Sequence, residues 1–207
     1  MNKALIIFQK NMVAGKVKTR LAADIGSEQA LAVYEFLVKH THRIVQSLDA
    51  AKFLFFSEYL ESPPAPHYQC YLQEGADLGA RMQQAFATVW ALGYKEVVII
   101  GTDCYELDTP LLEQAFEALE KNDAVLGPAL DGGYYLLGLR KPLDSLFANK
   151  TWSSGTVLSA SIANLQEAKK SYVLLQEISD IDQLKDIPPA LRQYLGLLPI
   201  NHQDKSI

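Results

Sequence analysis

The sequence has few residues that bind soft metal ions or form disulfides. Its two cysteines, Cys70 and Cys104, stand far apart, and its four histidines are scattered along the chain. This excludes a disulfide scaffold and a Cys-x-x-Cys metal site, and no His-Glu-x-x-His segment indicates a zinc enzyme. The low cysteine content is that expected of a protein from a reducing compartment.

Long hydrophobic runs and a strong charge of one sign are also absent. No apolar run reaches the roughly 20 residues of a membrane-spanning helix. The short apolar run over residues 4–8 lacks the cleavage site of a signal peptide. The net charge of −5 argues against general nucleic-acid binding, which needs a basic face. We therefore expect a cytoplasmic protein with no membrane span and no nucleic-acid partner.

Strand patterns of the buried type alternate with helical patterns along all 207 residues. Strands are predicted over residues 4–9, 52–56, 68–72, 96–100, 123–127, 134–139 and 171–175. Helices are predicted over 27–48, 78–92, 110–121 with Thr109 as N-cap, from Ser153 or Ser154 to 169, and 188–194. The alternation predicts an α/β fold with a mostly parallel central sheet and helices on both faces. We expect one domain over residues 1–200 and a polar tail over 201–207.

Three cations follow the first predicted strand at alternate positions, Lys16, Lys18 and Arg20, in a loop led by Gly15. Ligands of such sheets bind outside the carboxyl ends of the strands. A glycine-led basic loop at this place suits a polyanion such as a nucleotide phosphate. The spacing differs from that of a P-loop. A solvated charged surface is the alternative interpretation.

Aspartates follow two other strands of the predicted sheet. Asp103 comes directly after the strand at 96–100, where its carboxylate is placed to bind a magnesium or manganese ion that bridges nucleotide phosphates. The segment Asp180-Ile181-Asp182 places two carboxylates on one side of an extended chain, where they would complete a metal site with Asp103. Each aspartate has an equally simple interpretation as the cap of the turn or helix that follows it.

The segment Asp-Gly-Gly-Tyr-Tyr at residues 131–135 lies between two predicted strands. Its glycines either form a simple turn or let the backbone approach a sugar or acceptor, with Asp131 as hydrogen-bond acceptor or base. Tyr134 and Tyr135 point to opposite faces of an extended chain, so one can reach a ligand while the other packs in the core. Trp152, just before a predicted helix, is a candidate wall of the same pocket.

These segments occur in one order along the chain. They are Lys16-Val17-Lys18-Thr19-Arg20-Leu21, Gly101-Thr102-Asp103-Cys104, Asp131-Gly132-Gly133-Tyr134-Tyr135, Trp152-Ser153 and Asp180-Ile181-Asp182. Together they resemble the bacterial family once catalogued as a domain of unknown function and now often labelled an arsenosugar-biosynthesis-type glycosyltransferase. That family is placed among the nucleotide-diphospho-sugar transferases of GT-A fold, and the resemblance covers residues 3–187.

The resemblance implies roles for particular residues. Lys18 and Arg20, assisted by Lys16, would hold the nucleotide's phosphates, and Asp103 would be the metal-binding aspartate. Asp182, in the position of the late aspartate of related nucleotidyltransferases, is the candidate for a second metal contact. The usual Asp-x-Asp of this fold is reduced here to one aspartate, because position 101 is Gly. The family usually has proline after its Asp-Cys, where this chain has Tyr105.

Three functions fit these residues. The first is transfer of a sugar from a nucleotide-diphospho-sugar to a small-molecule acceptor, with the metal and the basic loop stabilising the departing diphosphate. The second is nucleotidyl transfer from a nucleoside triphosphate to a phosphorylated acceptor with release of pyrophosphate, as in the more distantly similar guanylyl- and cytidylyltransferases. The third is a non-catalytic nucleotide-binding module of the same fold.

Overall fold

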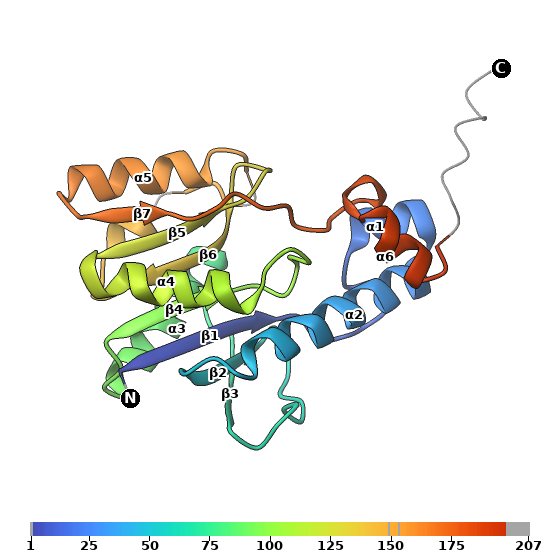
Figure 1. Cartoon of the computed structure of the whole chain (residues 1–207), viewed down its shortest axis with the longest axis horizontal. Coiled ribbons are helices and arrows are strands. Elements are labelled where there is room, and N and C mark those ends of the chain that lie inside the picture. The colour runs from blue at the N-terminus through green and yellow to red at the C-terminus, as the bar shows by residue number, and fades with distance from the viewer. Residues whose placement is uncertain (1, 149, 153, 198–207) are drawn as a thin grey trace.

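A computed structural model describes residues 2–148, 150–152 and 154–197 of the chain. Figure 1 shows a central sheet flanked by helices, with a smaller helical group at one end. The strands are β1 (Lys3–Gln9), β2 (Ala51–Phe56), β3 (Tyr68–Leu72), β4 (Glu96–Ile100), β5 (Ala124–Pro128), β6 (Tyr134–Leu139) and β7 (Tyr172–Leu174). The helices are α1 (Thr19–Ile25), α2 (Ser27–Val45), α3 (Leu78–Ala91), α4 (Thr109–Lys121), η1 (Asp144–Leu146), α5 (Val157–Glu167), η2 (Leu184–Asp186) and α6 (Pro189–Tyr194).

The seven strands form one sheet in the order β3-β2-β1-β4-β6-β5-β7. Strand β6 is antiparallel to its neighbours β4 and β5, and the other described pairs are parallel. The central strands β1 and β4 are buried almost throughout because helices cover both faces of the sheet. The predicted α/β fold with a mostly parallel sheet is confirmed.

Two apolar clusters fill the space between the sheet and its helices. On one face, α4 and the second half of α2 pack on the sheet through Val45, Leu112 and Phe116. On the other face, α3 and α5 do so through Phe86 and Leu165. Tyr135 belongs to the first cluster and Tyr134 to the second, as expected for neighbours in an extended strand.

A third apolar cluster lies apart from the sheet, where α1, the first half of α2, η2 and α6 meet (Figure 1). Its buried residues include Leu21, Leu37, Ile187 and Leu191. This helical group holds the basic loop and the segment before η2 close to the carboxyl edge of the sheet. None of the described helices is both long and apolar enough to span a membrane.

The structure corrects several predicted boundaries. The basic loop ends at Lys18, because the unpredicted helix α1 begins at Thr19. Helix α2, predicted to reach residue 48, ends at Val45. The N-cap of α4 is Asp108, whose carboxylate accepts a hydrogen bond from the Leu111 amide at 2.9 Å, so the prediction of Thr109 was wrong. Helix α5 begins at Val157, later than predicted. Ser153, the other candidate start of that helix, and the tail over 201–207 lie outside the described residues.

Candidate functional site

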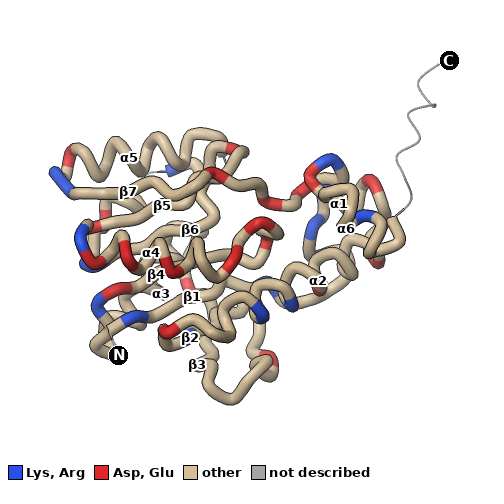
Figure 2. The backbone as a smooth tube through the Cα atoms, in the orientation of Figure 1, with Lys and Arg blue, Asp and Glu red and all other residues tan. Residues whose placement is uncertain are grey.

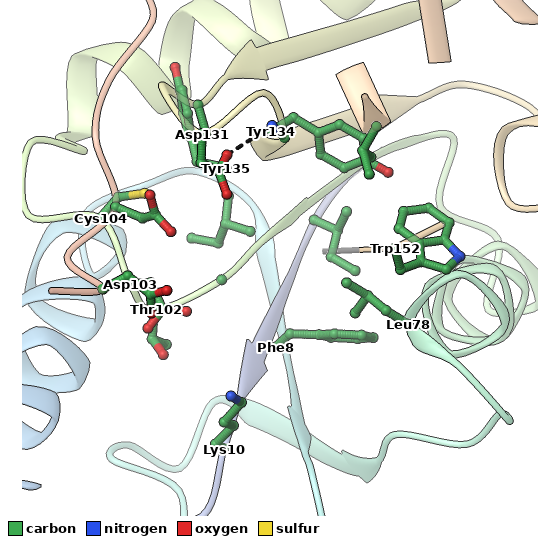
Figure 3. Close-up of a pocket in the computed structure, with 18 of the residues that line it drawn as sticks. Phe8, Lys10, Leu78, Thr102, Asp103, Cys104, Asp131, Tyr134, Tyr135 and Trp152 are labelled. Atoms are coloured by element: carbon green, nitrogen blue, oxygen red, sulfur yellow. Dashed lines mark hydrogen bonds between the residues drawn. The ribbon is translucent and has the colours of Figure 1, made fainter. Parts of the chain in front are cut away.

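A cavity of about 480 Å³ opens at the carboxyl ends of β1 and β4, beside the start of β6. Acidic and basic side chains form one side of it, and apolar rings form the other (Figure 3). The place is the one expected for a ligand site in a sheet of this kind.

Lys18 brings the basic loop into the wall of this cavity. Its backbone is left-handed, with φ 48° and ψ 45°, a conformation that costs a residue other than glycine roughly 1–2 kcal/mol. The side chain is only 4% exposed; its ammonium donates to the Ile181 carbonyl oxygen at 2.5 Å and forms an ion pair with Asp103. These two contacts supply the partners that a buried ammonium requires.

The other predicted phosphate-binding residues are placed differently from one another. Arg20, in the first turn of α1, lines the cavity, with Nη1 2.9 Å from Oδ2 of Asp182. Figure 2 shows both positive and negative charge in the part of the molecule around α1 and α6. Lys16 points elsewhere, with Nζ 2.8 Å from Oε2 of Glu58, and neither it nor Gly15 lines the cavity.

Four aspartates, Asp103, Asp131, Asp180 and Asp182, line the cavity. Burial raises the pKa of Asp180, and the charges of Asp131, Asp103 and Asp182 raise that pKa further. Within residues 2–148, 150–152 and 154–197, however, no three acidic, histidine or cysteine side chains are grouped as metal ligands.

The chemistry and surroundings of Asp103 and Asp182 bear on their predicted role as metal ligands. Each carboxylate reaches the cavity and is ion-paired there, Asp103 with Lys18 and Asp182 with Arg20. Magnesium is commonly held by one or two carboxylates together with substrate phosphates. Two carboxylates on the wall of one cavity fit the protein's share of that pattern.

Tyr34 of α2 ties the ends of two central strands together. Its hydroxyl oxygen accepts a hydrogen bond from the backbone N–H of Lys10 at 2.8 Å and lies 3.0 Å from the hydroxyl of Thr102. The side chain is buried, and burial together with the charge of Asp103 raises the pKa of Tyr34, so the phenol stays protonated. The sequence analysis assigned no role to Tyr34, Lys10 or Thr102, although Lys10 follows directly on the first predicted strand.

The segment at 131–135 forms a tight turn. The amide of Gly133 donates to Oδ1 of Asp131 at 2.8 Å, the dashed line in Figure 3. Gly132 has φ +86°, and a Cβ there would lie 2.2 Å from the carbonyl oxygen of Gly155. Gly132 therefore permits a close approach of two chain segments and does not line the cavity, whereas Asp131 and Gly133 do.

Apolar side chains face the charged side from across the cavity. Phe8, Leu78 and Trp152 lie there in Figure 3, with the ring of Tyr134 nearby. Trp152 packs against α3 so closely that a Cβ on Gly79 would lie 2.4 Å from its ring. The indole nitrogen of Trp152 and the hydroxyl of Tyr134 are buried without a hydrogen-bond partner among the described residues, and burial raises the pKa of Tyr134.

Comparison with known proteins identifies both a family and a fold. Residues 40–154 match the model of a family described as "Uncharacterized protein conserved in bacteria (DUF2064)". No curated protein sequence matches the chain. A crystal structure from Desulfovibrio desulfuricans G20, described as a proposed nucleotide-diphospho-sugar transferase, is similar with a TM-score of 0.82 and 27% identity, covering 93% of this chain and 91% of that one.

More distant structures share the fold. The inositol-1-phosphate CTP transferase from T. maritima has a TM-score of 0.56 and 12% identity over 95% of this chain and 96% of its own. The 2-C-methyl-D-erythritol 4-phosphate cytidylyltransferase from Thermus thermophilus has a TM-score of 0.52 and 14% identity over 90% of this chain and 95% of its own. All three of these neighbours are transferases by description, and the predicted nucleotide-diphospho-sugar transferase-like fold is confirmed.

Proposed function

The chain belongs to the DUF2064 family, and from that premise we propose that it is a transferase that takes a sugar from a nucleotide-diphospho-sugar and delivers it to a small-molecule acceptor. One observation carries the proposal. The pairs Lys18–Asp103 and Arg20–Asp182 lie at the carboxyl edge of the sheet, on the wall of a cavity whose other side is apolar. A ligand with a charged diphosphate and a ring matches this division. The similarity to the D. desulfuricans structure adds support.

The cations would act on the diphosphate. Lys18 and Arg20 reach the cavity with N–H groups that suit phosphate oxygens, and their positive charge would stabilise the charge that develops on the leaving group. Gly15, whose φ of 77° lies in the left-handed region, would shape the loop that carries these two side chains. Lys16 lies outside the cavity and is assigned no part in phosphate binding.

The acidic residues would divide between metal binding and proton transfer. Asp103 and Asp182 would hold a Mg²⁺ or Mn²⁺ ion, which when bound supplies positive charge to the diphosphate. Asp131 is the proposed base for the acceptor hydroxyl. Its Oδ1 is held by the Gly133 amide, which orients the carboxylate, and within the described chain its Oδ2 accepts no hydrogen bond.

The apolar side would receive the acceptor or the transferred sugar. Trp152 and the ring of Tyr134 line the cavity together with Gly133, whose lack of a side chain leaves room next to Asp131. Rings of this kind pack against the apolar face of a sugar or against another ring.

A nucleotidyltransferase is the second candidate. Three cations line the cavity, which suits a triphosphate, and two structural neighbours are described as CTP or cytidylyl transferases. The reaction product separates the two functions, because sugar transfer releases a nucleoside diphosphate and nucleotidyl transfer releases pyrophosphate. A non-catalytic module of this fold would bind a nucleotide and release neither.

A thermal-shift screen tests the proposal. The purified protein is mixed with nucleoside triphosphates or nucleotide-sugars, with and without Mg²⁺ or Mn²⁺, since a ligand that binds the folded state raises Tm. We expect one nucleotide-sugar with metal to raise Tm more than the matching triphosphate does. A larger shift with the triphosphate would favour nucleotidyl transfer, and no shift with any of them would contradict both transferase functions.

A double variant, Lys18→Ala with Arg20→Ala, serves as the control for phosphate recognition. If these residues bind phosphates, the loss of affinity should grow from nucleoside to monophosphate to diphosphate. Equal losses for a nucleoside and its diphosphate would contradict the assigned role.

A further inference from the structure

Lys10 is the cavity-lining cation that the proposed function has not used. It follows directly on Gln9, the last residue of β1, and its side chain is exposed at the cavity. In Figure 3 Lys10 lies at the end of the cavity opposite Asp131, with Thr102 and Asp103 between them. It therefore stands at the same carboxyl edge of the sheet as the two ion pairs.

The three lining cations differ in what they already contact. Lys18 is bound to Asp103 and to the Ile181 carbonyl, and Arg20 is bound to Asp182. The ammonium of Lys10, by contrast, has neither a carboxylate nor a hydrogen-bond acceptor within bonding distance in the part of the chain that the structure describes. An incoming phosphate can thus bind Lys10 without breaking an existing ion pair.

The backbone of Lys10 is fixed more firmly than that of an ordinary surface lysine. Its N–H donates to the hydroxyl of Tyr34 at 2.8 Å, and that hydroxyl also lies 3.0 Å from Thr102. Tyr34 is only 2% exposed, so a buried side chain sets the direction in which the chain leaves β1. The point at which the Lys10 side chain leaves the backbone is therefore held beside the cavity.

The charge of the cavity also favours this residue. Four aspartates face three cations there, and two of those cations are already neutralised by aspartates. A phosphate that approaches would be repelled by the carboxylates unless an unpaired cation stood nearby. Among the described residues that line the cavity, Lys10 is that cation.

We propose that Lys10 is the primary phosphate-binding residue of the cavity, and that the anion it recognises is the diphosphate or pyrophosphate group of the substrate. This rests on the proposed function in that both require a phosphate ligand at this site. It assigns first contact to Lys10 and a later, supporting contact to Lys18 and Arg20.

Lys16 offers a matched control on the same stretch of chain. It is an exposed lysine, its ammonium is 2.8 Å from Glu58, and it lies outside the cavity. Lys10→Gln and Lys16→Gln each remove one positive charge from an exposed side chain of similar length. They therefore change the net charge equally and differ in whether the lost charge faces the cavity.

The test uses titration calorimetry with inorganic pyrophosphate on the full chain. We expect Lys10→Gln to weaken pyrophosphate binding about tenfold or more, which corresponds to about 1.4 kcal/mol. Lys16→Gln should change the affinity less than twofold, and Lys10→Arg should retain most of it. An unchanged Tm for the three variants would show that each is folded.

The inference is wrong if Lys10→Gln binds pyrophosphate as tightly as the wild type does. It is also wrong if Lys16→Gln loses as much affinity as Lys10→Gln. Wild-type protein that fails to bind pyrophosphate would overturn it too. The proposed function is judged separately, by the release of a nucleoside diphosphate. If a nucleoside diphosphate is released but Lys10→Gln binds pyrophosphate normally, the proposed function stands and the inference is wrong. If Lys10→Gln weakens pyrophosphate binding but no nucleoside diphosphate is released, the inference stands and the proposed function is wrong.

Discussion

Lys18 and Asp103 form an ion pair in which only the lysine is buried, with side chains 4% and 43% exposed. The same ammonium donates to the carbonyl oxygen of Ile181. One cation thus joins the loop after β1, the loop after β4 and the segment before η2. The cavity wall depends on this junction, and its loss should affect both stability and binding.

Asp103→Asn should destabilise the protein more than Asp182→Asn. The first change leaves the buried Lys18 ammonium with neutral partners only, which should lower the free energy of unfolding by about 1–3 kcal/mol. The second breaks an exposed pair and should cost less than about 1 kcal/mol. Urea unfolding measures both values, and equal losses would contradict the assigned importance of burial.

The same Asp103→Asn variant should nearly lose metal-dependent nucleotide binding while it remains folded. Calorimetry with a nucleotide in the presence and absence of Mg²⁺ provides the measurement. Undiminished binding of the metal–nucleotide complex would mean that Asp103 does not hold the metal.

Lys18→Gly should be more stable than Lys18→Ala. Both variants lose the buried ammonium, but only alanine keeps the strain of a left-handed backbone at φ 48°. We expect a difference of about 1 kcal/mol, because the steric cost that glycine avoids exceeds its extra unfolded-state entropy. Parallel urea unfolding of the two variants measures it, and a more stable alanine variant would show that the backbone relaxes.

The buried His42 should make the stability of the protein depend on pH. Burial lowers the pKa of His42 to about 4, and its ring nitrogens lie 3.1 Å from the Tyr68 hydroxyl and 2.8 Å from Oε1 of Gln9. An unfolded histidine titrates near pH 6.5, so below that pH the unfolded state binds more protons. The contribution of His42 is therefore complete above about pH 6.5 and is lost as the pH falls toward about 4.

The wild type should accordingly lose about 2–3 kcal/mol of stability through His42 over this interval. His42→Gln should be less stable than the wild type at pH 7, and the gap should shrink as the pH approaches 4. Chemical unfolding at a series of pH values checks this. A constant gap would mean that the imidazole is not kept neutral by the fold.

Much of the fold could be read from the sequence because its central strands are short, buried apolar runs. The predicted limits of β3, β4 and β6 agree with the structure, since each run is bounded by polar residues or glycine. Helix α1 could not be predicted in the same way. It has 7 residues, no side-chain cap and a left-handed Lys18 before it, and it is held by packing against α2 and α6.

The site was harder to predict because its contacts join distant parts of the chain. Position in the sequence indicated that Lys18, Asp103 and Asp182 would meet at one edge of the sheet, and all three line the cavity. The pattern could not show that Lys16 points away from the cavity to Glu58. Nor could it show that position 132 must be glycine because the Gly155 backbone packs against it. Those facts depend on how the helical group packs against the sheet.

Gly79→Ala should displace Trp152 from the apolar wall. Alanine normally favours a helix over glycine by about 0.5–1 kcal/mol. Here its Cβ would lie 2.4 Å from the Trp152 ring, so the indole must move. We expect a net loss of about 1–3 kcal/mol, as for other overpacked sites, together with weaker binding of any ligand that contacts the wall.

A double-mutant cycle separates the clash from other effects of the substitution. In a Trp152→Ala background the obstacle is gone, so Gly79→Ala should be neutral or should stabilise by up to about 1 kcal/mol. The interaction energy between the two positions should then be about 1–4 kcal/mol by urea unfolding. If Gly79→Ala costs the same in both backgrounds, the indole does not pack on Gly79, and Trp152 cannot form the rigid apolar wall that the proposed acceptor site requires.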